Sequence, residues 1–335
     1  MILRFLYKLF VMGLFFFPFY SCDTDIEPVD FVQSSIEEQN PDLYNKYLTN
    51  LRNYKSSPHK FSLAWINNAK ISVNQSQHIM SLPDSVDYAV LSNPSLISQE
   101  MQAEMKEARD KKLIKSLYVV DYMSVKAAYE KHLKDGLDLE KEVFLSDSID
   151  KAISYCNQFG FDGIIVSYQG TQSVNLSPEE LEEATADENL ILDKVRNWMS
   201  QNGNKETVFM GLPENLLDRD FLNNVRYVML PSQNFTSKGD IEYLILQQSR
   251  FYPVDKMFIL TNSPSLDSKD KETGYFLNGQ LAIEGAADVV YSFNVEGKSL
   301  AGMGVLNVSN LYFNLNCTYS ELRNAIGIMN PSYKN

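Results

Sequence analysis

The clearest indication of the fold comes from residues 161–170, which read FDGIIVSYQG. Ile164, Ile165 and Val166 form a short run of β-branched apolar residues inside this stretch. An unbroken run of this kind is typical of a strand that is covered on both faces in a parallel sheet. Polar side chains return only at Ser167 and Gln169. The stretch therefore predicts a buried parallel strand that presents polar residues at its carboxyl end.

Similar short apolar segments recur along the chain, with helical patterns between them. The predicted strands are residues 61–66, 88–91, 117–120, 164–166, 208–210, 227–230, 257–260 and 289–293. Strands that alternate with helices imply parallel crossovers, and a series of eight predicts a single (β/α)8 barrel of the α/β class. No internal repeat and no linker rich in proline, glycine and serine interrupts the series.

The clearest predicted helix begins after Ser177, which is followed by Pro178 and two acidic residues. A serine cap, a proline in the first position and acids in the first turn favour a helix start, and Asn202 and Gly203 favour its end. The other predicted helices are residues 98–112, 145–159, 213–222, 241–248, 281–287 and 322–329. The charged residues 131–142 predict a solvated loop and helix.

With Asp162 and Gly163 in place, the opening stretch resembles the fourth barrel strand of the family 18 glycoside hydrolases, the chitinases and endo-β-N-acetylglucosaminidases. That strand reads Asp-Gly-x-Asp-x-Asp-x-Glu, and its three later acidic positions are occupied here by Ile165, Ser167 and Gln169. The segment 302–331 also resembles the C-terminal helix of family 18-like lipoproteins from outer-membrane glycan-uptake systems. The resemblance therefore covers most of the chain and implies a family 18-like barrel.

The chemistry that this resemblance implies needs two carboxyl groups. One protonated acid donates to the leaving glycosidic oxygen, and a second carboxylate orients the acetamido group of the substrate. Gln169 has no proton of this kind to donate, although its amide both donates and accepts hydrogen bonds. Ser167 is likewise a hydrogen-bonding group without a charge. We therefore expect a barrel that binds sugar and is not an enzyme.

Residues 1–21 have the pattern of a lipoprotein signal peptide. Arg4 and Lys8 precede an apolar run that is short for a membrane span, and the run ends at Ser21 and Cys22. Cys22 is the predicted lipidation site; a plain secretory signal and a buried strand are the alternatives. Residues 22–41 have few aliphatic residues and many acidic ones, so they are predicted to form a flexible acidic tether. Residues 42–335 are predicted to form the barrel domain.

The acidic residues directly behind Cys22 resemble the export signal of surface lipoproteins in glycan-foraging Gram-negative bacteria. This resemblance implies a lipid anchor in the outer membrane and a position that faces the cell exterior. It also implies outer-membrane glycan-uptake proteins as partners.

Candidate ligand contacts are the residues at the predicted carboxyl ends of the strands, where barrels carry their functional loops. Aromatic rings pack on the apolar faces of sugars, and amides and hydroxyls bind sugar hydroxyl groups. The candidate glycan-binding residues are Trp65, Tyr122, Ser167, Tyr168, Gln169, Gln233, Asn234 and Phe293. The large aromatic residues among them are also compatible with core packing. Asp162, at the start of its strand, is expected to be structural.

Other classes of function are not supported by the residues present. The three histidines are scattered and there is no cysteine cluster, so we expect no metal and no cofactor. Cys156 and Cys317 remain after Cys22; a disulfide and two free thiols are both compatible with the sequence. The net charge of -13 would repel nucleic acid.

The sequence thus predicts a cell-surface lipoprotein that captures GlcNAc-containing oligosaccharides, N-glycans among them, for uptake. Two alternatives stand beside this hypothesis. One is an active glycosidase that uses acids outside the motif, such as Asp121 or Glu296. The other is a structural component of an outer-membrane complex.

Overall fold

The computed structural model describes residues 36–136, 139–314 and 317–331 of the chain. Two units are described separately: residues 36–45 hold α2 (Ile36–Gln39) and the start of α3 (Pro41–Ser56), and residues 46–331 hold the barrel. The predicted signal peptide, Cys22 and the first part of the predicted tether lie outside the described residues. None of the helices within these ranges combines the length and the apolar character needed to cross a membrane.

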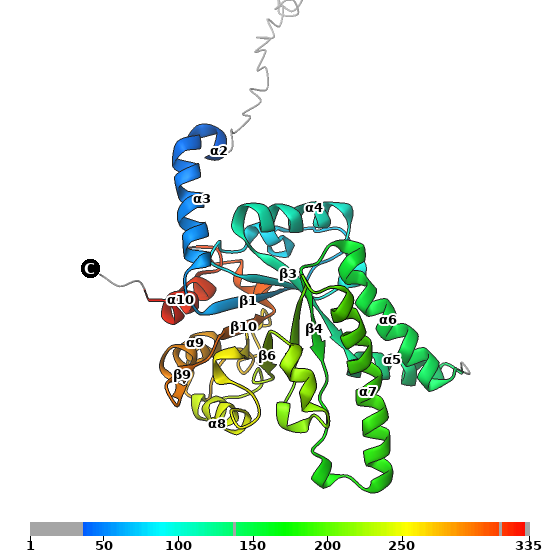
Figure 1. The fold of residues 1–335 in the computed structure, drawn as a ribbon. Helices are drawn as coiled ribbons and strands as arrows, with labels where there is room; N and C mark the ends of the chain where they lie inside the picture. The colour runs from blue at the N-terminus through cyan, green and yellow to red at the C-terminus, as the bar shows by residue number, and fades with distance from the viewer. Residues whose placement is uncertain (1–35, 137–138, 315–316, 332–335) are drawn as a thin grey trace, which may run out of the picture. The chain divides into compact units, whose positions relative to one another are not determined.

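Eight parallel strands close into a barrel (Figure 1). Their order around the barrel is β1 (Phe61–Ile66), β10 (Gly302–Leu306), β7 (Met257–Asn262), β6 (Tyr227–Leu230), β5 (Glu206–Met210), β4 (Gly163–Ser167), β3 (Lys115–Asp121) and β2 (Tyr88–Leu91). The predicted (β/α)8 barrel is confirmed. Every predicted strand except the last coincides with an observed one.

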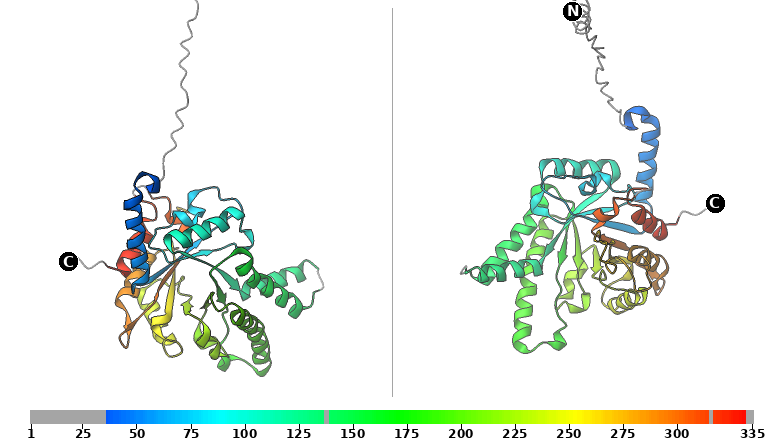
Figure 2. Two further views of the ribbon diagram at one scale, coloured as in Figure 1. Left: turned by 45° about the horizontal axis from the view of Figure 1, so that its top comes forward. Right: turned by 180° about the vertical axis from the view of Figure 1, so that it is seen from behind.

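Helices lie on the outside of the barrel (Figures 1 and 2). In chain order they are α4 (Gln99–Glu107), which continues as a π-helical segment (Ala108–Lys112), α5 (Tyr122–Lys134), α6 (Lys141–Phe159), α7 (Pro178–Gln201), α8 (Lys238–Gln248), α9 (Ala282–Ser292) and α10 (Ser320–Met329). The predicted start of α7 is confirmed, because Ser177 and Glu180 form a capping box. The connection from β1 to β2 contains only the 3-10 turns η1 (Gln75–Gln77) and η2 (Ile79–Ser81).

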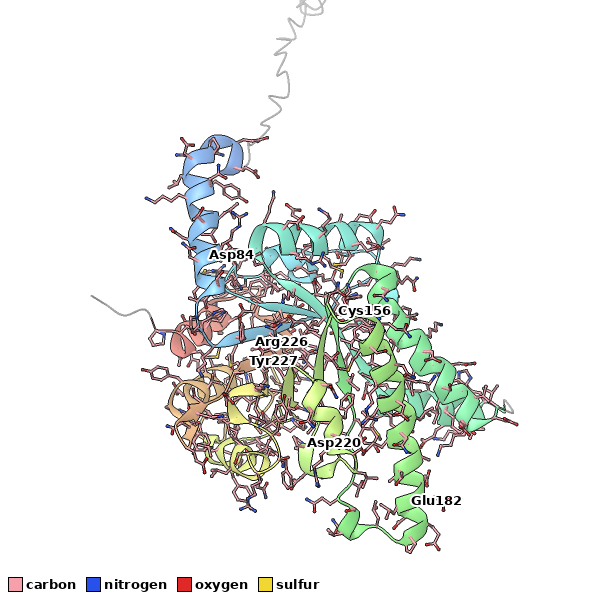
Figure 3. All side chains as sticks on the ribbon, in the orientation of Figure 1. Asp84, Cys156, Glu182, Asp220, Arg226 and Tyr227 are labelled. Atoms are coloured by element: carbon pink, nitrogen blue, oxygen red, sulfur yellow. The ribbon has the colours of Figure 1, made fainter. Side chains whose placement is uncertain are left out.

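The alternation of side chains along β4 separates two apolar cores. Ile165 points into the barrel and packs with residues of the other strands, whereas Ile164 and Val166 belong to the larger core between the sheet and the helices. Cys156 of α6 lies in this outer core (Figure 3). Both cysteines within the described residues are free thiols, and only Cys156 is buried.

The predicted eighth strand, residues 289–293, is wrong. Residues 289–292 are the end of α9, where Val289 and Val290 belong to a buried helix face, and Phe293 follows as the C-cap. The last barrel strand is β10, which lies inside the segment 302–331 that resembles a C-terminal helix. Gly302 and Gly304 give β10 a low strand propensity. A Cβ atom on Gly304 would lie only 2.6 Å from the Trp65 ring, so the close approach of that ring requires a glycine.

The predicted helix over residues 213–222 is also wrong, because two 3-10 turns, η6 (Pro213–Asn215) and η7 (Arg219–Asn224), occupy this part of the chain. The buried carboxylate of Glu188 in α7 accepts hydrogen bonds from the backbone N–H groups of Leu217, at 3.1 Å, and Asp218, at 2.7 Å. These donors are therefore not available to a continuous helix. Burial raises the pKa of Glu188, and the two N–H donors act against that rise.

We predict that Gly304→Ala lowers the free energy of unfolding by about 1–3 kcal/mol, because the added methyl group overpacks the barrel against Trp65 and Leu260. Gly327→Ala in α10 is the matched control, since a Cβ atom there meets nothing within 4 Å. Alanine is the better helix former, so this control should be neutral or stabilising by about 0.5–1 kcal/mol. Urea denaturation measures both changes, and equal stability of the two variants would contradict the packing argument.

Candidate functional site

A cavity of about 350 Å³ lies at the carboxyl end of β4. Residues from α5, from the loop that follows β4 and from α7 line it; they are Tyr122, Met123, Lys126, Tyr168, Gln169, Gly170, Thr171, Leu176, Glu180, Glu183, Ala184 and Asp187. In barrels of this architecture the functional residues gather at the carboxyl ends of the strands. The structure thus places three of the predicted contacts, Tyr122, Tyr168 and Gln169, in one cavity.

Two tyrosine rings form the inner side of this cavity. Tyr122 and Tyr168 are both buried, and their ring centroids lie 5.6 Å apart in an edge-to-face arrangement. Burial raises the pKa of both phenols, with the carboxylate of Asp187 adding to the rise at each. The phenols are therefore protonated at neutral pH. The Tyr168 hydroxyl donates to the Ala184 carbonyl oxygen at 3.4 Å, and the Tyr122 hydroxyl lies beside the Asp187 carboxylate, which interacts with it.

The backbone of Gln169 is fixed, and its side chain is exposed. Its carbonyl oxygen accepts a hydrogen bond from Asn215 Nδ2 at 3.0 Å. The next residue, Gly170, has a φ of +57°, and a Cβ atom there would lie 2.7 Å from the Asn215 carbonyl oxygen. Glycine is required at this position for both reasons. The side-chain amide of Gln169 makes no hydrogen bond within the described residues, so it is available to a ligand.

Ion pairs hold the charged residues of the cavity between α5, α6 and α7. Lys126 Nζ lies 2.7 Å from Asp187 Oδ2, and Lys141 Nζ lies 2.8 Å from Glu183 Oε1. Asp187 is mostly buried, with 13% of its side chain exposed, whereas Glu183 is exposed. The Asp187 carboxylate is thus held against the ammonium group of Lys126.

The two acids proposed for an active glycosidase lie in different places. Asp121 pairs with Ser167 in the register of β3 and β4, and its carboxylate caps α5 by accepting from the Ser124 N–H group at 3.3 Å. Glu296 lies in the turn between β8 (Asn294–Val295) and β9 (Lys298–Ser299). Lys298 of this hairpin lies 3.6 Å from Asp255, which precedes β7, so the hairpin is at the amino end of the barrel.

The other predicted contacts lie outside this cavity. Trp65 and Ser167 are buried, and Trp65 belongs to the barrel interior. Gln233 is half-buried after β6, and its Oε1 atom has no partner among the described residues, while Asn234 is exposed. The predicted strand-end position of Phe293 is wrong, since this residue follows α9 and packs against the outer core.

Sequence reasoning did not select Lys126 or the acids of α7. Glu180, Glu183 and Asp187 are spaced by three and four residues, which places them on one face of a helix. That spacing is the signal that could have found them. It was not informative alone, because α7 carries acids on other faces as well, among them Glu179 and Glu182. The contact between α5 and α7, through Lys126 and Asp187, shows which face of α7 lines the cavity.

Asp162, the residue of the acidic motif that is kept, lies just before β4. Its carboxylate accepts from Arg109 Nε at 2.6 Å and from the Ser116 N–H group at 2.8 Å. Gly163 follows with its Cα close to the backbone of Glu206 in β5. These contacts agree with the structural role expected for Asp162 and lie at the opposite end of the strand from Gln169.

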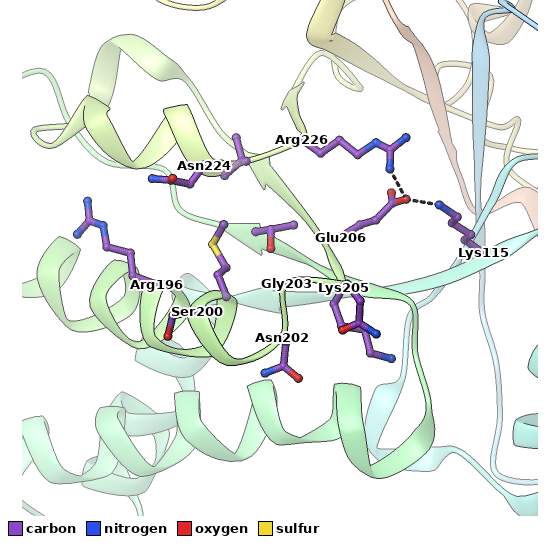
Figure 4. A pocket seen from close by; sticks show the side chains of 13 residues that line it. Lys115, Arg196, Ser200, Asn202, Gly203, Lys205, Glu206, Asn224 and Arg226 are labelled. Atoms are coloured by element: carbon purple, nitrogen blue, oxygen red, sulfur yellow. Dashed lines mark hydrogen bonds and ion pairs between the residues drawn. The ribbon is translucent and has the colours of Figure 1, made fainter.

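A larger cavity, of about 740 Å³, lies at the amino ends of β3, β5 and β6 (Figure 4). Figure 4 shows Lys115 and Arg226 directed at the carboxylate of Glu206, which is 7% exposed and also accepts from the Tyr88 hydroxyl at 2.8 Å. The charged groups here satisfy one another, and the functional loops of such barrels are at the other end. The smaller cavity is therefore the better candidate site.

Comparison with known proteins places the whole barrel in one group. The family model for glycoside hydrolase family 18, BT1044-like, matches residues 24–328. A solved BT1044 variant with a glutamate replaced by glutamine has a TM-score of 0.62 and 19% identity, covering 89% of this chain and 96% of its own. No curated protein matches the sequence.

Two further solved structures carry sugar-related descriptions. The apo endo-β-N-acetylglucosaminidase from Cordyceps militaris has a TM-score of 0.60 and 14% identity, and covers 85% of this chain and 96% of its own. YKL-39, solved in the presence of chitooligosaccharides, has a TM-score of 0.53 and 11% identity, and covers 81% of this chain and 100% of its own. At these identities the likeness shows a shared fold.

We predict that Gly170→Ala costs more stability than Gly160→Ala. Both glycines have a positive φ, +57° and +75°, but a Cβ atom meets the Asn215 carbonyl only at residue 170 and meets nothing within 4 Å at residue 160. The shared conformational cost is about 1 kcal/mol, and the clash should add about 1–2 kcal/mol at residue 170. Chemical denaturation of both variants gives the difference. If the two losses are the same, Asn215 does not constrain the loop that carries Gln169.

Proposed function

Since this chain belongs to the BT1044-like group of glycoside hydrolase family 18, we propose that it is a cell-surface lipoprotein that binds a GlcNAc-containing glycan without cleaving it. The observation that carries the proposal is Gln169. Its free amide stands at the end of β4, where the family pattern has its proton-donating acid, and it lines a cavity that also contains two tyrosines.

The absence of hydrolysis is inferred from what the nearby carboxyl groups do. Ile165 and Ser167 replace the other acids of the strand motif. Asp121 is engaged in capping α5, and Asp187 is paired with Lys126. A family 18 mechanism needs a protonated acid together with a second carboxylate. No residue of β4 or of the strand end from 163 to 169 carries a carboxyl group.

Binding is supported by the chemistry of the cavity. The Gln169 amide, which makes no hydrogen bond within the described residues, can donate to and accept from sugar hydroxyl or acetamido groups. Thr171 adds a further hydroxyl at the rim. Pockets for small ligands combine apolar walls with a few polar groups of this kind.

Relatives support GlcNAc as part of the ligand. A variant of the Cordyceps militaris enzyme, with aspartate and glutamate two residues apart replaced by asparagine and glutamine, was solved with fucosyl-N-acetylglucosamine-Asn; its TM-score is 0.57 at 14% identity. Ser167 and Gln169 are also two residues apart. This chain thus has uncharged residues at the same spacing, which favours capture of a GlcNAc-containing oligosaccharide, N-glycans included.

The location is proposed from the start of the sequence. Cys22 would carry the lipid, and residues 1–21 would be removed. The acidic segment that follows resembles the signal for export to the outer face of the outer membrane. Glycan-uptake proteins of the same membrane are the partners that this location implies.

Calorimetric titration of the purified protein with chitooligosaccharides and N-glycans tests the proposal. We predict saturable binding, and we predict that Gln169→Ala weakens it about tenfold, because two or more hydrogen bonds to the amide are lost. Gln172→Ala is the matched control, since Gln172 lies in the same loop outside the cavity lining. Absence of binding to every glycan, or an equal loss in the control, would contradict the proposal.

A further inference from the structure

The charge of the cavity at β4 gives a prediction about which glycans it accepts, and this inference rests on the proposed function. Four charged side chains line the cavity: Glu180, Glu183, Asp187 and Lys126. Three of them are carboxylates on one face of α7, and the single cation comes from α5. The lining therefore carries more negative than positive charge.

Each carboxylate is held in place by a hydrogen bond or an ion pair. The Ser177 N–H group donates to Glu180 at 2.8 Å, and this hydrogen bond lowers the pKa of Glu180. Glu183 pairs with Lys141 at 2.8 Å. Asp187 lies between two lysines, 2.7 Å from Lys126 and 3.8 Å from Lys141.

The two lysines do not make the net charge of the cavity positive. With Lys141 included, which reaches the acids from outside the lining, three carboxylates face two ammonium groups. Both lysines are already engaged, so an incoming anion would have to compete with Asp187 or Glu183 for them. The net charge of -13 for the whole chain adds a repulsive background.

The same carboxylates can bind an uncharged sugar. An ionised carboxylate is purely a hydrogen-bond acceptor, and sugar hydroxyl groups are donors. A sulfate or carboxylate group on the sugar presents only hydrogen-bond acceptors, and it carries the same negative charge as the carboxylates of the cavity. One surface thus attracts hydroxyl groups and repels anionic substituents.

We propose that this cavity selects uncharged GlcNAc-containing oligosaccharides and rejects forms that carry a carboxylate or a sulfate group close to the bound sugar. Glu180 and Glu183 are the specificity-determining residues. One like charge at contact distance in a wet site weakens binding about fivefold, and more where water is excluded.

The test compares N-acetylchitotetraose with the same tetrasaccharide carrying one 6-O-sulfate, by calorimetry on the purified protein at low and high salt. The variant is Glu180→Gln with Glu183→Gln. Glutamine still completes the capping box at residue 180, and the ion pair of Glu183 is exposed, so the fold should be retained. The control is Glu179→Gln with Glu182→Gln. It also removes two negative charges from α7, but from residues outside the cavity lining; Figure 3 labels Glu182 on this helix.

For the wild type and the control variant we expect about fivefold or greater preference for the neutral sugar, reduced by salt. For the cavity variant we expect the preference to fall to about twofold or less. Equal affinity of the wild type for both sugars would overturn the inference while leaving the proposed function intact, and so would an equal loss of preference in both variants. If the wild type binds neither sugar nor any N-glycan, the proposed function fails and the inference fails with it.

Discussion

The structure depends on the closure of the barrel between β1 and β10, where the packing leaves no room for side chains on Gly302 and Gly304. Because β10 has no Cβ atom at residue 304, the Trp65 ring can fill the barrel interior. Closure with all strands parallel brings their carboxyl ends to one face. The position of Gln169 at that face follows from this constraint and from its fixed place after β4.

Much of this architecture could be predicted from local sequence. The β-branched runs located the strands that carry them, and the cap at Ser177 located α7. The errors arose where a distant contact overrides local preference. Gly302 is in a strand because of its neighbour across the sheet, and residues 213–222 do not form one helix because Glu188, far away in the chain, binds their backbone.

The site could be predicted only where local sequence signals locate its residues. Tyr168 and Gln169 follow a strand that the sequence marks clearly, so their place at its carboxyl end could be inferred. Phe293 was misplaced because its assignment rested on a strand that does not exist. The charged residues that line the same cavity as Gln169, Lys126 and Asp187, come from two helices whose contact is a property of the packed fold.

We propose that this family 18 barrel, with a carboxamide at residue 169, retains sugar binding and lacks hydrolysis. The most direct measurement is mass spectrometry of a GlcNAc-containing oligosaccharide and of an N-glycoprotein after prolonged incubation with saturating wild-type protein. We expect both to be recovered at their full mass from a sample in which the glycan is bound. Release of sugar in proportion to protein concentration, abolished by Asp121→Asn, would contradict it.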